Sequence, residues 1–268
     1  MLERTQFFSN ACNQIFEEFY PVGCASPSHV IHVTCTGYIS PSGAQQVVAK
    51  RNWTSQVTHA YHMGCYASLP AVRMAQAFSI SQNQNVDVVH TELCSLHLNP
   101  SNHSPEQIVV QSLFADGFIK YEVGAQPTSF EILKIKELII PDSASMMTWL
   151  TSDFGMQMSL SKDVPTTIAK HLTSFLEEFQ IDFENTIFAI HPGGPRIIDS
   201  IQDLLKLPEE KVAHAKNVLF RYGNMSSATL PHIWQDIASD ANVASGTKIM
   251  SLAFGPGLTI FGGLLQKI

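Results

Sequence analysis

The stretch TIFAIHPGGPRIIDSIQDLL, residues 186–205, decides the fold class of this chain. Its first five residues are apolar or β-branched, as in a buried strand, and the proline and glycines after His191 end that strand. A helix is then expected to open at Pro195, with Ile198 and Ile201 on its buried face. A buried strand that passes through a glycine turn into a helix is the repeating unit of α/β folds.

Strand-like and helix-like segments alternate along the rest of the chain as well. The predicted strands are His29–Thr34, Asn85–His90, Phe118–Val123, Phe130–Ile140, Lys248–Phe254 and Leu258–Leu264, with a turn at Asp116-Gly117. The predicted helices are the amphipathic N-terminal segment, Gly43–Lys50, one that starts at Asp163-Val164-Pro165, and Lys211–Tyr222. This order predicts an α/β protein with a parallel or mixed sheet. A soft boundary near Gly124–Thr128 separates two halves of similar element order, so we expect domains at residues 1–125 and 126–268.

Composition excludes several classes of function. The 268 residues are 45% hydrophobic and only 15% charged, with a net charge of −7 and no run of Lys or Arg. Nucleic-acid or anionic-membrane binding would need a basic patch, so neither partner is expected. No apolar stretch reaches the roughly 20 residues that span a bilayer. The five cysteines show no C-x-x-C pair and no zinc spacing, which indicates free thiols, no metal site, and a soluble cytoplasmic protein.

Cys65 is the first candidate for chemistry. Gly64 allows a tight turn into it, and the small residues that follow predict a buried helix. Amides of a first helical turn would stabilise the thiolate over the thiol. Pro70 argues against a regular helix from Cys65 onward, so we expect either a kink or a helix that begins later. A buried cysteine is, on spacing alone, more often inert than reactive.

His191 and Asn224 are the other two candidates. His191 ends a buried strand before two glycines, the position at which α/β folds form their clefts. Asn224 follows Gly223, where its amide could donate to a developing oxyanion. A histidine at a strand end is more often structural, and an asparagine there is more often a turn residue. Together with Cys65 they form a Cys/His/Asn set that suits nucleophilic acyl transfer, and the residue types alone leave a cysteine hydrolase open.

The wording of these segments goes further than residue types. HVTCTGYISPSGAQ, THAYHMGCYASLPAVRMA, TELCSLH, LFADGF, KDVPTTIAKHL, FAIHPGGPRIIDSI, RYGNMSSATL and FGPGLTI occur in this order over about residues 25–268. They resemble the chalcone/stilbene synthase family of type III polyketide synthases, and especially its bacterial alkylpyrone and alkylresorcinol synthases. IHPGGPRIID and RYGNMSSATL are the most specific matches.

The resemblance implies a thiolase-like fold, in which two similar βαβαβ halves stack in five layers, and normally a homodimer. It implies that Cys65 is the nucleophile and that His191 and Asn224 promote decarboxylation of malonyl-CoA. An acyl group from coenzyme A would be loaded on the cysteine, and the malonyl carbanion would attack it. Coenzyme A thioesters are substrates, and no metal or prosthetic group is implied.

Further residues are expected to bind substrate on the same grounds. Gly193 and Gly194 would lie near the pantetheine arm, and the segment from Phe254 to Pro256 would line the product cavity. Leu98 and Met158 stand at gatekeeper positions that are usually Phe in plant enzymes. Flexible aliphatic side chains there suit a long fatty acyl starter. Only about thirty residues precede the TCTG strand, so the first half is expected to be incomplete.

Three hypotheses follow for the function. The first is an enzyme that condenses a long-chain acyl-CoA with malonyl-CoA to an alkylpyrone or alkylresorcinol-type polyketide. The second is a single-condensation 3-oxoacyl synthase or thioesterase of the same superfamily. The third, of another class, is a catalytically degenerate paralogue that only binds or dimerises.

Overall fold

The computed structural model describes residues 1–124 and 126–268, so residue 125, the last residue of the first predicted domain, lies outside the described residues. The elements before it are α1 (Leu2–Phe19), β1 (His29–Thr34), α2 (Gly43–Lys50), β2 (Gln56–Tyr61), α3 (Ser68–Gln82), β3 (Val86–Leu93), η1 (Cys94–His97), α4 (Pro105–Leu113) and β4 (Asp116–Val123). Those after it are β5 (Phe130–Ile139), β6 (Met147–Thr151), β7 (Met156–Leu160), α5 (Val164–Glu177), β8 (Thr186–Ile190), α6 (Pro195–Leu205), η2 (Glu209–Lys211), α7 (Ala213–Tyr222), η3 (Ser226–Ala228), α8 (Thr229–Ser239), β9 (Lys248–Gly255) and β10 (Thr259–Lys267).

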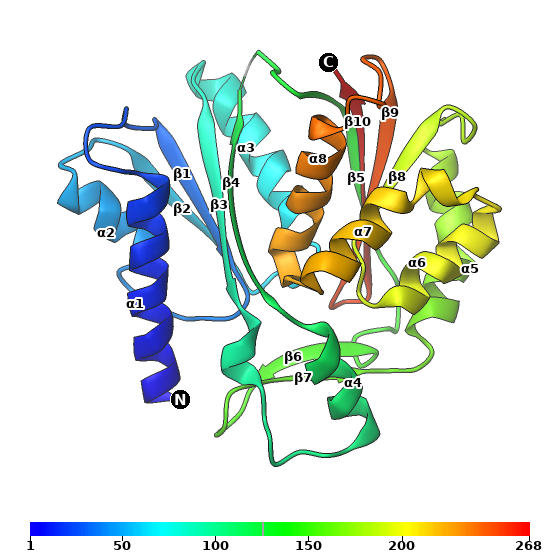
Figure 1. Ribbon diagram of the computed structural model, residues 1–268, viewed down its shortest axis with the longest axis horizontal. Helices are drawn as coiled ribbons and strands as arrows, with labels where there is room; N and C mark the ends of the chain where they lie inside the picture. Colours follow the sequence, from blue (N-terminus) through cyan, green and yellow to red (C-terminus); the bar gives the residue numbers. More distant parts are fainter. Residues whose placement is uncertain (125) are drawn as a thin grey trace.

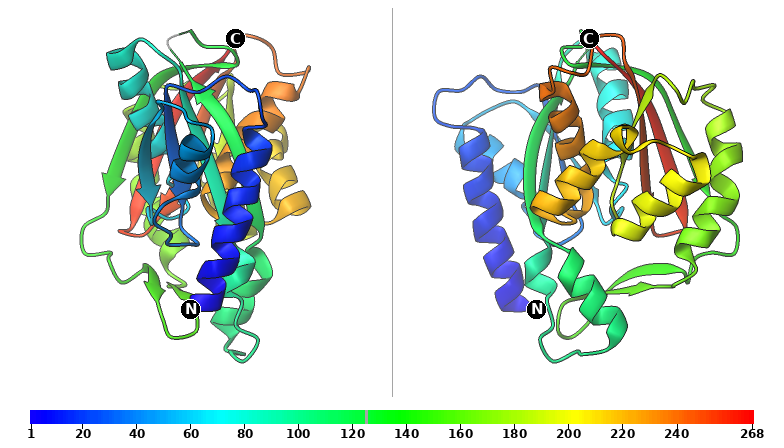
Figure 2. Two further views of the ribbon diagram at one scale, coloured as in Figure 1. Left: turned by 90° about the vertical axis from the view of Figure 1, so that its left-hand side faces the viewer. Right: turned by 45° about the vertical axis from the view of Figure 1, so that its right-hand side comes forward.

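Two four-stranded sheets organise the molecule, in the orders β2-β1-β3-β4 and β5-β10-β9-β8. α3 and α8 lie between the sheets, α1 and α2 cover the outer side of the first sheet, and α5 and α6 cover the outer side of the second (Figure 1). The side view shows α1 running along the first sheet (Figure 2). Helices and sheets thus alternate in five layers, which confirms the predicted α/β fold class and its layered arrangement.

The two sheets repeat one strand pattern. β1 pairs parallel with β3, and β3 pairs antiparallel with β4. In the same way β8 pairs parallel with β9, and β9 pairs antiparallel with β10. β5 then continues the second sheet beyond β10, whereas β4 is the edge of the first sheet among the described residues. The first half therefore has the shorter sheet at this side.

Equivalent strands are preceded by equivalent helices. α3 leads into β3 and α8 leads into β9, and both helices lie in the central layer. The loops that enter these two helices carry Cys65 and Asn224 respectively. The two loops meet in space, because Cys65 of one and Ser226 of the other line the same small cavity.

Most elements follow the sequence prediction closely. β1, α2 and β8 have the predicted bounds, and α5 buries the predicted stripe that includes Ile168 and Leu172. The predicted turn at Asp116-Gly117 is wrong, because both residues pair with the end of β3 and belong to β4. Pairing along a whole ladder outweighs the local turn preference of this dipeptide. The sequence analysis does not predict β2, the β6–β7 hairpin, α4 or α8.

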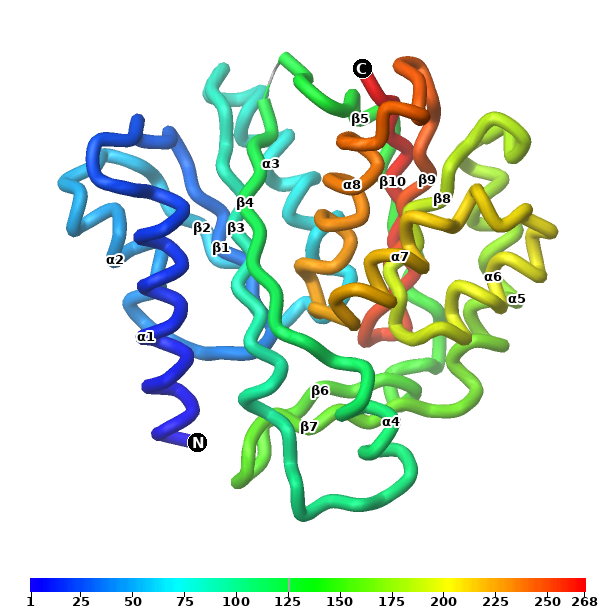
Figure 3. Tube along the Cα trace, viewed as in Figure 1, coloured from blue at the N-terminus to red at the C-terminus, as the bar shows by residue number. Residues whose placement is uncertain are grey.

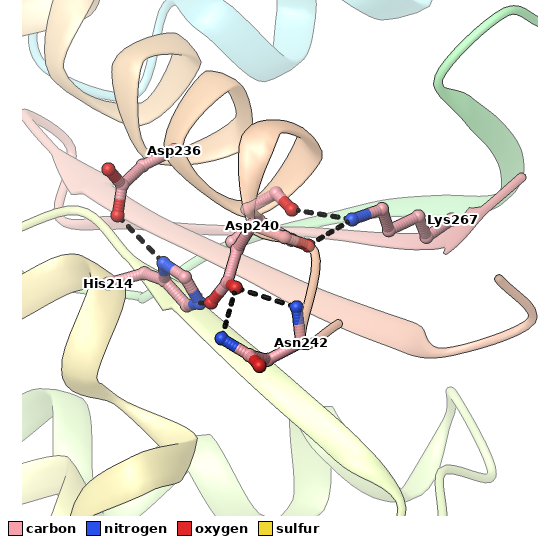
Figure 4. Close-up of polar contacts among 6 residues, drawn as sticks. His214, Asp236, Asp240, Asn242 and Lys267 are labelled. Carbon is pink, nitrogen blue, oxygen red and sulfur yellow. Dashed lines mark hydrogen bonds and ion pairs between the residues drawn. The ribbon is translucent and has the colours of Figure 1, made fainter. Parts of the chain in front are cut away.

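The C-terminal end of α8 is tied to α7 and to β10 by charged side chains. His214 on α7 contacts Asp236 at 2.7 Å and Asp240 at 3.5 Å (Figure 4). Lys267 donates to the carbonyls of Ile237 and Asp240, at 3.0 and 2.8 Å, near the C-terminus of α8 (Figure 4). A cation at a helix C-terminus stabilises the last carbonyls and the helix dipole. These contacts fix the C-terminal end of α8 against α7 and β10.

α4 and the β6–β7 hairpin lie together at one end of the molecule (Figures 1 and 3). The Gln107 side chain on α4 donates to the Met158 carbonyl on β7 at 2.9 Å, which ties the two elements together. Met158 and the residue after α4, Phe114, face the loop that carries Cys65. This end of the fold therefore closes over the candidate site.

Candidate active site

Cys65 lies in the loop between β2 and α3. Gly64 has a φ of 82°, and a Cβ there would stand 2.6 Å from Pro256 Cδ, so only glycine fits both the backbone and the space. Helix α3 begins at Ser68, three residues after Cys65. The expectation of a later helix start is confirmed, and it places Pro70 in the first turn, where its missing N–H costs no helical hydrogen bond.

Asn224 lies in the turn between α7 and α8. Gly223, with a φ of 74°, ends α7, and the Asn224 backbone bonds to Leu113 and Ala115 at 2.8 and 2.9 Å. Its side-chain oxygen accepts from the Ser226 N–H at 2.9 Å. With the oxygen engaged, the NH₂ group is the part of the carboxamide that remains to donate to another group.

The structure brings Cys65 and Asn224 together. Ser226 Oγ lies 3.9 Å from Cys65 Sγ. Burial is the largest influence on the Cys65 thiol and raises its pKa to about 12, while hydrogen bonding from Ser226 and then from Asn224 acts in the opposite direction. The buried carboxyl group of Glu92 raises the pKa further. The expectation of a stabilised thiolate is therefore wrong for the free protein: Cys65 precedes the helix instead of lying in its first turn, and burial dominates.

His191 ends β8 as predicted, and its backbone N–H bonds to the Leu252 carbonyl at 2.7 Å. The side chain is 1% exposed, and burial lowers its pKa to about 3, so the imidazole is neutral. Neither ring nitrogen has a hydrogen-bond partner among the described residues, so no such bond joins it to Cys65 or Asn224. A buried imidazole without partners is costly, and such exceptions in native proteins call for a functional explanation.

A small cavity of about 20 Å³ lies beside Cys65, with room for about one water molecule. Met158 and Pro256, two of the expected substrate-binding residues, line it, and so does Phe114. Leu98 does not line it: this residue follows η1 and is 47% exposed. Phe114, which lines the cavity, belongs to the LFADGF segment, where the sequence analysis did not single it out.

The remaining predicted pocket residues lie close in the chain to those that line the cavity. Phe254 is 4% exposed and belongs to the core at the end of β9, two residues before Pro256. Gly193 and Gly194 follow His191, and a Cβ on Gly194 would lie 3.2 Å from Leu113 Cδ1. Gly194 therefore permits the close approach of this loop to the end of α4, next to Phe114.

Glu92 is a candidate site residue that sequence reasoning missed. It is 0% exposed on β3, and burial raises its pKa although several hydrogen bonds oppose this. One carboxylate oxygen accepts from Cys35 N–H and the Thr36 hydroxyl, both at 2.9 Å. The other accepts from the hydroxyl of Ser227. The signal that could have found it is an acidic residue inside a strand whose neighbours are all buried.

No group of three or more His, Cys, Asp or Glu side chains in residues 1–124 and 126–268 is arranged to hold a metal ion. None of the helices in the same ranges is both long enough and apolar enough to cross a membrane.

Comparison with known proteins assigns the chain to a family. Residues 131–268 match the family described as chalcone and stilbene synthases, C-terminal domain. The chain is a member of the chalcone and stilbene synthase family. Members of this family are acyltransferases, which confirms the class of enzyme inferred from the sequence.

Two relatives extend the comparison beyond the matched segment. Type III polyketide synthase C of Arabidopsis thaliana is 27% identical in an alignment 263 residues long, and the match covers 90% of this chain and 68% of that protein. The type III polyketide synthase domain of Steely1, a type I/III hybrid from Dictyostelium, superimposes with a TM-score of 0.91 at 24% identity. That comparison covers 100% of this chain and 80% of the domain, and it confirms the fold expected of a chalcone synthase-like protein.

Proposed function

We propose that this chain condenses a long-chain acyl-CoA starter with malonyl-CoA and releases an alkylpyrone or alkylresorcinol-type polyketide. The observation that carries the proposal is a buried thiol next to the turn that holds an oriented carboxamide, in a chain that also carries a buried, unpartnered imidazole directly after β8. Cys65 is the proposed nucleophile, and His191 and Asn224 are its proposed partners. These roles agree with the family motifs in which the three residues stand.

Loading begins from a neutral thiol, because the raised pKa of Cys65 leaves little thiolate at neutral pH. A base must take the thiol proton as sulfur attacks the thioester carbonyl of the starter. His191 is neutral and has a free ring lone pair, which suits this role. The hydrogen bond that transfers the proton would form only when substrate is bound. The carbonyl–sulfur bond of the starter breaks, free coenzyme A leaves with the proton, and the acyl group remains on Cys65.

Condensation follows from the same groups. The malonyl carboxylate leaves as CO₂, and its bonding electrons pass to the neighbouring carbon and thioester oxygen. The Asn224 NH₂ and the His191 N–H would donate to that enolate oxygen, which is the electrostatic help such a step requires. The carbanion attacks the acyl carbonyl on Cys65, a carbon–carbon bond forms, and the cysteine sulfur leaves and regains a proton. Each round therefore takes up one proton from the medium.

Substrate binding rests on the residues around the loops. Gly193, which is partly exposed, and Gly194, which is buried against Leu113, are the proposed neighbours of the pantetheine arm, and Phe254 and Pro256 form the proposed wall of the product cavity. The cavity beside Cys65 is too small for an acyl chain. Met158 has an unbranched, flexible side chain that can rearrange to admit one, which favours an aliphatic starter over a planar aromatic one.

The test is turnover of radiolabelled malonyl-CoA with a series of saturated acyl-CoAs from lauroyl to stearoyl. Wild type should give a lipophilic cyclic product, and Cys65→Ala should give none. Cys24→Ala is the matched control, because Cys24 is a free cysteine that does not line the cavity. Equal product from wild type and Cys65→Ala, or no product with any starter, would reject the proposal.

The small cavity favours a second candidate, a single-condensation 3-oxoacyl synthase or a thioesterase. Such an enzyme needs no room for a growing chain, and its product would be a linear β-ketoacid or a free acid without a ring. The raised pKa of Cys65 is the feature that favours the third reading, a degenerate binding or dimerising paralogue. Product analysis in the same assay separates all three.

We also propose that residues 1–125 and 126–268 act as two domains and that the chain forms a homodimer. The large apolar side chains of Leu2, Phe7 and Tyr38 in the first half are 73%, 60% and 56% exposed, which supports a partner that covers part of this half. Light scattering after gel filtration tests this, since a monomer at micromolar concentration would contradict it.

A further inference from the structure

A chain of buried hydrogen bonds runs through the first sheet to the turn that holds Asn224. His90 on β3 lies between Tyr121 on β4 and Ser227 in η3, with its ring nitrogens 3.1 Å from the Tyr121 hydroxyl and 3.0 Å from Ser227 Oγ. Ser227 in turn contacts Glu92, two residues after His90 on the same face of β3. His90, Ser227 and Glu92 are all 0% exposed, so water does not substitute for these contacts.

The direction of each hydrogen bond in this series is fixed by the first one, at Glu92. The carboxylate accepts from the backbone N–H groups of Cys35 and Ser227, at 2.9 and 3.4 Å, and a backbone N–H can only donate. The Ser227 hydroxyl also donates to the Glu92 carboxylate, so its oxygen is left to accept from His90. His90 must then carry its proton on Nδ1, and the Tyr121 hydroxyl donates to the bare Nε2.

Burial keeps this arrangement from changing with protonation. His90 is neutral, because burial lowers its pKa to about 3, with a smaller contribution from His232. Burial also raises the pKa of Tyr121, so the phenol keeps its proton. The Tyr121 ring stacks on His90 with centroids 5.6 Å apart, which holds the imidazole plane. One tautomer and one ring orientation are thus selected.

This series of hydrogen bonds reaches the candidate site from two sides. On one side, Ser227 adjoins Ser226, whose N–H orients the Asn224 carboxamide and whose hydroxyl approaches Cys65. On the other side, Glu92 holds the Cys35 backbone, and Cys35 Sγ accepts from the N–H of Gly64 at 3.0 Å, directly before Cys65. The relative position of nucleophile and amide therefore depends on Glu92 and on what fixes Ser227.

We propose that His90 is a positioning residue that orients the Asn224 amide through Ser227 and Glu92. It touches no reacting atom, and its contribution is a donor of fixed direction to the Ser227 hydroxyl. This inference rests on the proposed function for its catalytic readout. The sequence carries no signal for it, because a histidine in a run of apolar strand residues resembles a satisfied core histidine.

The test compares His90→Leu with His90→Asn. Asparagine carries its amide nitrogen at the same number of bonds from Cα as histidine Nδ1, so it can restore the donor to Ser227. We expect His90→Leu to lower kcat roughly 10- to 100-fold, the effect of about 1 Å of misplacement, with KM for malonyl-CoA nearly unchanged. His90→Asn should recover most of that loss.

His32→Leu is the matched control. His32 is equally buried on the neighbouring strand β1, but it bonds to Thr91 and Tyr61 and does not reach η3. It should lower stability as His90→Leu does and leave kcat of the folded protein unchanged. An unchanged kcat in His90→Leu, no recovery in His90→Asn, or an equal loss in His32→Leu would overturn the proposal.

Two measurements on the free protein separate this inference from the proposed function. Nitrogen-15 spectra of labelled protein should show the His90 proton on Nδ1, and a proton on Nε2 would contradict the chain. Alkylation of Cys65 by iodoacetamide at alkaline pH should slow roughly three- to tenfold in His90→Leu, because Ser226 and Asn224 then lower the thiol pKa less. Unchanged alkylation would reject the positioning role, even if wild type condensed no substrate.

Discussion

The thiol of Cys65 should react slowly in the free protein, although it is the proposed nucleophile. The perturbation is pH: iodoacetamide is added between pH 7 and pH 11, and alkylation of each cysteine is followed by peptide mass spectrometry. Burial raises the pKa of Cys65 to about 12. Since only the thiolate is alkylated, the rate should rise about tenfold per pH unit over the whole range without a plateau.

The magnitude follows from the thiolate fraction. With a pKa of about 12, the fraction at pH 8 is roughly 10⁻⁴, against about 0.2 for a free cysteine of pKa near 8.5. A more basic thiolate is also more nucleophilic, which returns roughly 40-fold for a Brønsted coefficient of about 0.45. Cys65 should therefore react about 50-fold more slowly than a free cysteine at pH 8, before any steric protection is counted.

Cys24 is the internal reference, because it is the one free cysteine classed as partly exposed among the described residues, and Cys65→Ser identifies the peptide signal. Asn224→Asp should slow alkylation further, since it replaces a hydrogen-bond donor to the sulfur by a negative charge. Alkylation of Cys65 faster than Cys24 at neutral pH, with a plateau below pH 8, would refute the reasoning. It would show that His191 or the loop amides stabilise a thiolate in solution.

Three further predictions concern the pocket and the framework. Phe114→Ala should shift turnover toward longer or bulkier starters because it removes a wall of the cavity, whereas Leu98→Ala should leave the product spectrum unchanged, as liquid chromatography with mass detection would show. Gly117→Ala should destabilise the fold by roughly 1–3 kcal/mol in urea titration, because its Cβ would stand 2.5 Å from Met225 Cβ, and a neutral effect would contradict this packing. Lys267→Met should cost roughly 1–2 kcal/mol in the same titration, because two carbonyls near the C-terminus of α8 lose a charged donor, and an unchanged midpoint would count against that role.

Local pattern sufficed for the elements whose burial is periodic and continuous. The strand before His191 and the helix after it, and the bounds of β1 and α2, follow from residues that contact their own neighbours in the chain. The segments that resemble the family identified the candidate set of Cys65, His191 and Asn224. The β6–β7 hairpin was missed because its two strands are only five residues long and pair only with each other.

The sequence by itself determined the α/β class, the family, and which cysteine, histidine and asparagine stand in its motifs. Only the tertiary structure decided the environment of these groups: that Phe114 and not Leu98 lines the cavity, and that burial makes Cys65 a weak acid. The contacts of Glu92 and His90 with Ser227 are likewise visible only in the tertiary structure. The reason is that solvent exclusion and hydrogen-bond direction depend on atoms brought together from distant segments of the chain. A local sequence pattern contains no information on which distant atoms will surround a side chain.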